Sequence, residues 1–161
     1  MSSAHVFRPI RSLEILAEVR RAILRSVPGV EPARIDRMRD DMQAAFPDAT
    51  VSPCPRPVSR MKNDPGDRHV PAAAVAGNAQ AIVTWNMRHF PVRLCRPLRI
   101  AVCSPDELLA RAQADSPEAV ESALSCQVAR YTAPPMTVDE LLGRHAVRLP
   151  GFIAAVRVRR T

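Results

Sequence analysis

The apolar side chains of the first fifty residues recur every three or four positions, which is the spacing of an amphipathic helix. One stripe follows Ser12, a residue type that caps helix N-termini, and another follows Pro32, which suits a first helical position. The stripes consist of Leu16, Val19 and Ile23, and of Ile35, Met38, Met42 and Phe46. The pattern therefore predicts two helices, the first ending at Val27-Pro28-Gly29 and the second at Pro47.

Short apolar runs in the middle of the chain predict strands. Ala81–Thr84 and Leu98–Cys103 have the length and composition of buried strands, while residues 5–7 and 48–51 are weaker candidates. An alanine-rich helix over Ala72–Ala76 precedes the first of the buried strands. Helices that alternate with short buried strands indicate an α/β domain with a mainly parallel sheet.

The last third of the chain predicts helices with well-marked starts. Ser104-Pro105-Asp106-Glu107 and Thr137-Val138-Asp139-Glu140 are capping boxes, in which a hydroxyl and a glutamate three residues later bond each other's backbone N–H groups. Ser116-Pro117 opens a further helix. We therefore expect an α/β domain over residues 1–103 and a helical extension over residues 104–161 that packs on it.

The charge favours a polyanionic partner without proving one. The chain has a net charge of +7, and Lys62 is the only lysine among its 23 basic residues. Guanidinium groups match the geometry of phosphate, so nucleic acid is a partner consistent with this composition. Basic surfaces are also common on proteins that bind no nucleic acid.

Cysteine spacing and hydropathy exclude other classes. The four cysteines form no C-x-x-C pair and the four histidines are scattered, so no zinc site is expected and the thiols are predicted to be reduced. No apolar run approaches the ~20 residues that span a bilayer. The first eleven residues lack the apolar core of a secretory signal. These features predict a cytoplasmic protein with no membrane association.

Polar residues cluster around the alanine-rich helix and the strand after it. Asp64 and Asp67 lie in an acidic turn that opens the helix, and Asn86 follows the strand. Functional groups collect where parallel strands end, so Asp67 and Asn86 are expected to face one crevice. The alternatives are that Asp67 caps the helix and that Asn86 is an ordinary turn residue.

These segments resemble the PIN domain of VapC-like ribonuclease toxins. Residues 64–74 match the pattern D-P-x-D-R-H-V-x-A-A-A, and residues 82–91 match I-V-T-x-N-x-x-x-F-P. Residues 12–18 resemble the family's S-x-x-I-L-x-E helix, and residues 134–142 resemble the C-terminal extension of one VapC-like subgroup. The resemblance covers nearly the whole chain and implies a three-layer α/β/α fold with a helical extension.

The resemblance implies a toxin of a toxin–antitoxin system that hydrolyses RNA phosphodiester bonds with a metal-activated water. Hard divalent cations prefer oxygen ligands, which fits the acidic residues at the matching positions. On this basis Glu18, Asp67 and Asn86 are the implied catalytic residues. Glu18, Asp67 and Asp64 are the implied ligands of Mg²⁺ or Mn²⁺.

The same resemblance implies further contacts and partners. Thr84 and Arg68 match positions that bind the substrate, Thr84 by orienting the ligands or the phosphate and Arg68 by contacting the phosphate. The implied partners are an RNA substrate, a cognate antitoxin protein and, as a homodimer, a second copy of the chain.

Three departures from the family pattern predict weak or absent Mg²⁺ binding and an impaired nuclease. No acidic residue lies before Glu14, where the family has a central strand ending in aspartate. His89 stands where an aspartate usually precedes Phe-Pro, and imidazole is a poor Mg²⁺ ligand. Pro71 removes an N–H that would bond the Asp67 carbonyl. We therefore expect the sheet to lack its first central strand. Either a start codon assigned too far downstream or a decayed copy of the gene would explain this loss.

Two other functions compete with the nuclease. The main alternative is a catalytically inactive PIN remnant that binds RNA or a partner protein. A small basic DNA-binding module is less consistent with the sequence, because no helix-turn-helix with the usual short glycine turn is visible.

Overall fold

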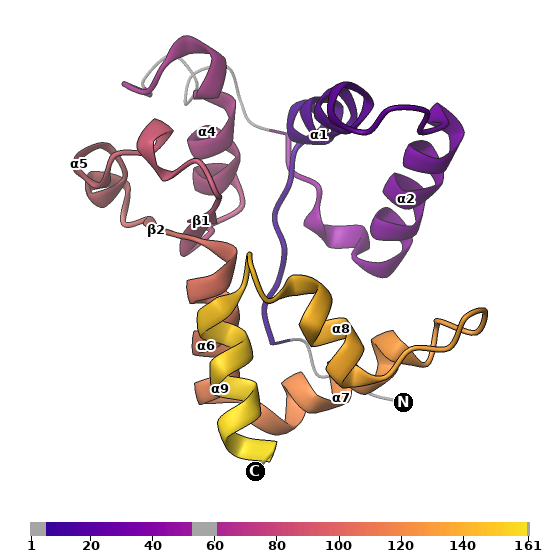
Figure 1. The fold of residues 1–161 in the computed structure, drawn as a ribbon. Coiled ribbons are helices and arrows are strands. Elements are labelled where there is room, and N and C mark those ends of the chain that lie inside the picture. Colours follow the sequence, from indigo (N-terminus) through magenta and orange to yellow (C-terminus); the bar gives the residue numbers. More distant parts are fainter. Residues whose placement is uncertain (1–5, 53–60, 161) are drawn as a thin grey trace. The chain divides into compact units, whose positions relative to one another are not determined.

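The structure is a computed structural model that describes residues 6–52 and 61–160 (Figure 1). The chain divides into two compact units. The N-terminal unit comprises residues 8–82 and 86–102, and the C-terminal unit comprises the remaining described residues, mainly those from Cys103 onward.

The two helices predicted in the first fifty residues are present. Helix α1 spans Leu13–Ser26 and begins where the Ser12 hydroxyl accepts a hydrogen bond from the Ile15 N–H at 3.2 Å. Helix α2 spans Pro32–Ala45, with proline in its first turn as predicted. The two helices pack side by side in the N-terminal unit (Figure 1).

A buried arginine joins the segment before α1 to the end of α2. The Arg11 side chain donates to the carbonyl oxygens of Met42 at 3.0 Å and Phe46 at 2.9 Å, at the C-terminal end of α2. Its backbone N–H donates to the Ala49 carbonyl at 2.8 Å, and its carbonyl accepts from Val51 at 2.8 Å. Arg11 is only 4% exposed. Its side chain therefore fixes the end of α2, while its main chain pairs with the segment that follows α2.

The prediction of strands at residues 48–51 and 5–7 was wrong for the described residues. Pro47–Ala49 form the 3₁₀ turn η1, and Thr50 makes a single parallel bridge with Arg11. Val6 and Phe7 lie in a bend, and His5 lies outside the described residues. A strand needs a continuous ladder of backbone partners, and here the neighbouring segment provides one bridge only.

Helix α4 spans His69–Ala76 and follows the 3₁₀ turn η2 at Pro65–Asp67. Pro71 is the third residue of α4, so its missing N–H is one that a helix start leaves unpaired in any case. The expected conflict with the Asp67 carbonyl is thus resolved by a later helix start. Gly77, just after the helix, passes so close to Ile10 that a Cβ there would lie 2.5 Å from its side chain.

The predicted buried strands pair in a small parallel sheet. Strand β1 spans Ala81–Val83 and strand β2 spans Ala101–Cys103. The connection between the strands contains the 3₁₀ helix η3 (Met87–His89), the short α-helix α5 (Val92–Cys95) and the 3₁₀ helix η4 (Arg96–Leu98). Strand β2 starts later than predicted because Leu98 ends η4 and Arg99 adopts a left-handed backbone with φ of 59°. The mixed helix-and-sheet class is confirmed, with a sheet of two strands in the described residues.

One hydrophobic cluster stabilises the part of the N-terminal unit that contains α4 and the sheet. It consists of Ala74, Ile82, Phe90, Cys95 and Ile100. These residues come from α4, β1, α5 and the segments that flank η3 and β2. The cluster therefore packs the loop that carries η3 against α4 and the sheet.

The C-terminal unit is helical, as predicted for the extension. It contains α6 (Pro105–Asp115), α7 (Pro117–Val128), α8 (Val138–His145) and α9 (Pro150–Arg160). Both predicted capping boxes are formed, at the starts of α6 and α8. The Asp106 carboxylate also accepts from the N–H groups of Gly151 at 3.0 Å and Phe152 at 2.8 Å, so it caps α9 from α6.

A larger hydrophobic core lies among these four helices. Its buried members are Ala112, Val120, Leu124, Leu141, Leu142, Phe152, Ile153 and Val156. Helices α6 and α9 pack closely against each other (Figure 1). Among the described residues, every helix is too short or too polar to cross a lipid bilayer.

Candidate functional site

The first candidate pair joins the acidic turn to the loop after β1. Asp67 is the last residue of η2 and His89 is the last residue of η3. Asp67 Oδ2 lies 3.0 Å from His89 Nδ1, and the two side chains are 21% and 38% exposed. A carboxylate and an imidazole from distant parts of the sequence therefore meet at a place that solvent reaches.

Asn63 holds these two turns together. It is buried, and its side-chain amide donates to the His89 carbonyl at 3.0 Å. The Asn63 carbonyl in turn accepts from Arg68 Nε at 3.0 Å. The sequence interpretation did not single out Asn63, although an asparagine directly before an Asp-Pro-Gly-Asp turn is a plausible signal for such a bond.

Asp64 and Asp67 have different roles in the turn. The Asp64 side chain accepts from the Gly66 N–H at 3.1 Å and so caps η2. Helix α4 has Arg68 at its N-cap and no side-chain cap bond. Asp67 therefore contacts His89 and does not cap α4, so the helix-cap alternative for this carboxylate was wrong.

A second carboxylate–histidine pair connects α1 with α4. Glu18 Oε2 lies 3.2 Å from His69 Nε2, with side chains 48% and 12% exposed. The distance suits an ion pair, but the angles do not make a hydrogen bond, and His69 Nε2 is a buried nitrogen without a hydrogen-bond partner. His69 thus lies next to Glu18, which is the predicted metal ligand on α1.

The residues present do not fit a Mg²⁺ site as they stand. The described residues contain no group of three or more histidine, cysteine, aspartate or glutamate side chains that could hold a metal ion. Glu18 and Asp67 are instead divided between two pairs, and Asp64 bonds its own turn. Mg²⁺ requires near-octahedral oxygen ligation, and neither pair supplies it from the protein.

The remaining predicted residues lie apart from these pairs or are engaged elsewhere. Asn86 is exposed, and its side-chain oxygen accepts from Arg88 Nε at 3.0 Å. Arg68 uses its Nε on Asn63. Thr84 belongs to the C-terminal unit, where its N–H donates to the Cys103 carbonyl at 3.0 Å. The predicted crevice shared by Asp67 and Asn86 stays a prediction.

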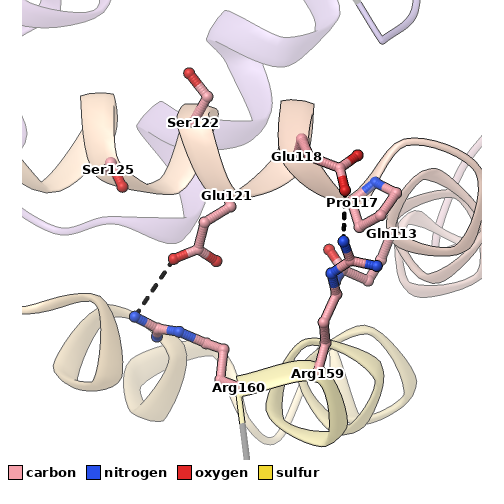
Figure 2. Close-up of a pocket in the computed structure, with 8 residues that line it drawn as sticks. All are labelled: Gln113, Pro117, Glu118, Glu121, Ser122, Ser125, Arg159 and Arg160. Carbon is pink, nitrogen blue, oxygen red and sulfur yellow. Dashed lines mark hydrogen bonds and ion pairs between the residues drawn. The ribbon is translucent and has the colours of Figure 1, made fainter.

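A pocket of about 400 Å³ is a second candidate region, and it lies wholly within the C-terminal unit. Figure 2 shows two ion pairs spanning the space between α7 and α9, Glu118 with Arg159 and Glu121 with Arg160, the latter at 3.4 Å. Gln113 from α6 is buried, and its side-chain oxygen has no hydrogen-bond partner. The charges lining this pocket balance, so it offers no cation or anion site of its own.

Comparison with known proteins finds similarity to VapC-type proteins. Residues 105–158 match the family model of the VapC50 C-terminal domain. A curated relative, "Putative ribonuclease VapC50" from Mycobacterium tuberculosis (strain ATCC 25618 / H37Rv), is 36% identical over 100 residues. The alignment covers 62% of this chain and 59% of that protein, so it spans less than two thirds of the relative. No solved structure matches the chain.

Proposed function

We propose that the chain is a VapC-like toxin that acts on RNA as a ribonuclease, with a PIN-like three-layer fold. The observation that carries the proposal is the partly exposed Asp67 carboxylate in the D-P-x-D-R-H-V motif, which is not used to cap α4. The relative of this chain carries the word ribonuclease in its name. The net charge of +7 suits a phosphate backbone.

The proposal includes a dependence of the nuclease on a metal ion and an impaired rate of RNA hydrolysis. Mg²⁺ or Mn²⁺ is the cofactor that the family chemistry implies, with Glu18, Asp64 and Asp67 as ligands. Each of these carboxylates has another partner in the structure. A hard cation would have to compete with those partners, and few carboxylates would offset its charge. We therefore propose that Mg²⁺ binds weakly and that hydrolysis is slow.

The proposed partners follow from the same family. They are an RNA substrate, a cognate antitoxin protein and a second copy of the chain in a homodimer. The proposed location is the cytoplasm. The exposed apolar side chains of α1 and α2 are consistent with a protein partner, since large apolar groups on a surface favour association.

The experiment that tests the function is RNA cleavage with purified protein in Mg²⁺ and in Mn²⁺. Wild type is expected to cleave an unstructured RNA slowly, and Asp67→Ala is expected to abolish cleavage. Asp41→Ala, which removes an exposed carboxylate from α2, is the matched control and should cleave like wild type. Equal cleavage by wild type and Asp67→Ala would refute the assignment of this site.

The second candidate function is an inactive remnant that binds RNA or a partner protein. The absence of a three-ligand group among the described residues favours it. If wild type shows no cleavage with either metal but retains RNA in a binding assay, and if Asp67→Ala binds equally well, the remnant is the correct function. Binding that falls steeply with salt would identify phosphate contacts as its source.

A further inference from the structure

We infer that Arg93, Arg96 and Arg99 form a surface that binds the phosphate backbone of RNA, which we call the arginine surface. The inference deepens the proposed function and rests on it for RNA as the polyanion. It adds three residues that belong neither to the family motifs nor to the carboxylate–histidine pairs. Binding is measured below without a metal ion, so that the result is independent of cleavage.

The positive charge of the chain is concentrated in its first 102 residues. Residues 1–102 contain 16 lysines and arginines and 9 aspartates and glutamates, whereas residues 103–161 contain seven of each. Within the first part, no acidic residue occurs between Asp67 and Asp106. The arginines of this stretch therefore have no acidic neighbours in the sequence, and their positive potential is available to an anion.

The three arginines are exposed and have no acidic partner among the described residues. Arg93 lies in α5, Arg96 begins η4 and Arg99 follows η4. The ion pairs that arginines form in the described residues lie on α1, α2 and α9. The carboxylates of α7 and α8 neutralise the arginines of α9, whereas the arginine surface keeps its charge for a ligand.

The spacing of the three arginines places them in a row. They follow one another at intervals of three residues, and residues three apart share one side of a 3₁₀ helix such as η4. A rise of about 2 Å per residue separates neighbours by about 6 Å. Long arginine side chains at this separation can reach successive phosphates of one strand, and the guanidinium fork bonds phosphate oxygens in pairs.

The backbone of Arg99 indicates that its side chain has a use. Arg99 has φ of 59° and ψ of 32°, a left-handed conformation that glycine adopts without steric cost and arginine does not. Residues held in such conformations cluster at functional sites. An arginine at this position lowers stability relative to glycine, and phosphate binding is the compensating gain that we infer.

The packing of the segment favours RNA over an acidic protein as the partner. Cys95 is fully buried, and Leu98 packs against the same hydrophobic cluster. These side chains hold the segment against α4 and the sheet, so they are not available to a partner. A protein interface has an apolar core inside a polar rim, whereas contacts with phosphate need only the exposed charges.

The test is binding of a fluorescently labelled oligouridylate to the full chain in EDTA, followed by anisotropy at several salt concentrations. The triple variant Arg93→Gln, Arg96→Gln, Arg99→Gln should bind at least about tenfold more weakly than wild type. The loss of three phosphate contacts should also reduce the slope of log K against log salt by about 2.

A second triple variant is the matched control. Arg21→Gln, Arg34→Gln, Arg37→Gln removes the same charge from exposed positions of α1 and α2. Long-range attraction to RNA falls equally in the two triple variants, because their net charge is the same. The control should therefore bind RNA more tightly than the first triple variant and keep the salt slope of wild type.

The single variant Arg99→Gly separates binding from folding. It should melt no lower than wild type, since glycine accepts the left-handed backbone. It should nevertheless bind RNA more weakly, with a salt slope reduced by about 0.7. Thermal melts of the two triple variants establish that they are folded.

The inference is overturned if the two triple variants lose RNA binding equally, or if Arg99→Gly binds RNA like wild type. It is also overturned if polyglutamate displaces the labelled RNA as well as unlabelled oligouridylate of equal charge does, because an acidic protein would then fit the arginine surface. If wild type cleaves RNA despite such a result, the proposed function survives and only the binding surface fails. If the triple variants differ as expected but wild type cleaves no RNA with either metal, the arginine surface stands and the ribonuclease fails.

Discussion

The helices of the two units are specified by the same local devices but differ in what they bury. Helices α6 to α9 contribute all eight buried residues of the larger core. Helix α1 buries none of its residues, and α2 buries only Ile35. Amphipathic spacing and a good N-cap are therefore sufficient to place a helix along the chain. They do not ensure that its apolar stripe finds a partner among the described residues.

Different interactions stabilise the two regions as a result. The C-terminal unit relies on apolar burial, which supplies most of the stability of a folded domain. Helices α1 and α2 are joined by the Arg20–Asp36 ion pair at 3.0 Å, in which both side chains are more than one third exposed. Such solvent-exposed pairs contribute little to stability. The buried Arg11 is the main polar contact that anchors α2.

The largest expected effect is the loss of a core side chain from the C-terminal unit. Leu142 is 2% exposed, so Leu142→Ala should lower the free energy of unfolding by about 2–5 kcal/mol through lost burial and a residual cavity. The matched variant in α1 is Leu13→Ala, at a residue that is 66% exposed. It should change stability by less than about 0.5 kcal/mol. Urea unfolding of both variants checks this, and equal losses would contradict the comparison.

The second largest effect on stability is expected from the removal of the buried Arg11 side chain. Arg11→Leu removes the guanidinium donor from the Met42 and Phe46 carbonyls, and hydrogen bonds from a charged group contribute about 1.5–3 kcal/mol. Amide hydrogen exchange should increase in the last turn of α2 more than in α6 or α9. Arg20→Leu is the control and should leave that turn protected. Uniform acceleration across all helices would show that Arg11 has no local role.

A capping-box variant should have a smaller effect. Thr137→Ala removes the hydroxyl that bonds the Glu140 N–H at 3.2 Å, which should cost about 1 kcal/mol of stability. A thermal melt measures it, and the corresponding Ser104→Ala change in α6 should give a similar loss. A loss below the error of the melt in both variants would argue against the boxes as stabilising features.

The Thr137–Glu140 capping box also predicts that the stability of the protein depends modestly on pH. Hydrogen bonds from the Thr137 backbone and hydroxyl hold the pKa of the Glu140 carboxyl below its ordinary range. Because the folded pKa is the lower one, the contribution is present at neutral pH and is lost as the pH falls through the folded pKa. Glu140→Gln should therefore flatten the acid limb of a stability-against-pH curve. An unchanged acid limb would contradict this role.

The smallest structural effect expected concerns thiol reactivity. Burial raises the pKa of the Cys95 thiol, whereas Cys126 is exposed on α7. The thiolate is the reactive form, so iodoacetamide should modify Cys126 well before Cys95. Mass spectrometry of a time course reads this order directly. Early modification of Cys95 in folded protein would show that its cluster opens readily.

The sequence predicted the elements whose causes are local. Ser12, Pro32 and the two capping boxes mark helix starts within a few residues of their own helices, and the structure has all of them. Residues 48–51 were misassigned because a strand depends on a partner elsewhere in the chain, and here only Thr50 bridges Arg11. No periodicity in one segment reports such a partner.

The candidate site was predicted as a set of residues but not as an arrangement. The motifs singled out Glu18 and Asp67, yet their histidine partners lie 51 and 22 positions away along the chain. His89 was noted only as a departure from the family pattern. The contact of its ring with Asp67 follows from Asn63, whose side chain bonds the backbone of the distant loop. Contacts of this kind depend on the packed fold and not on spacing.

The most direct test of the account compares RNA cleavage in Mg²⁺ by wild type, His89→Asp and Asp67→Ala. If the carboxylate–imidazole pair limits a VapC-like nuclease site, His89→Asp should cleave RNA faster than wild type and Asp67→Ala should not cleave it. Cleavage by His89→Asp that is no faster than by wild type, or unimpaired cleavage by Asp67→Ala, would contradict the account.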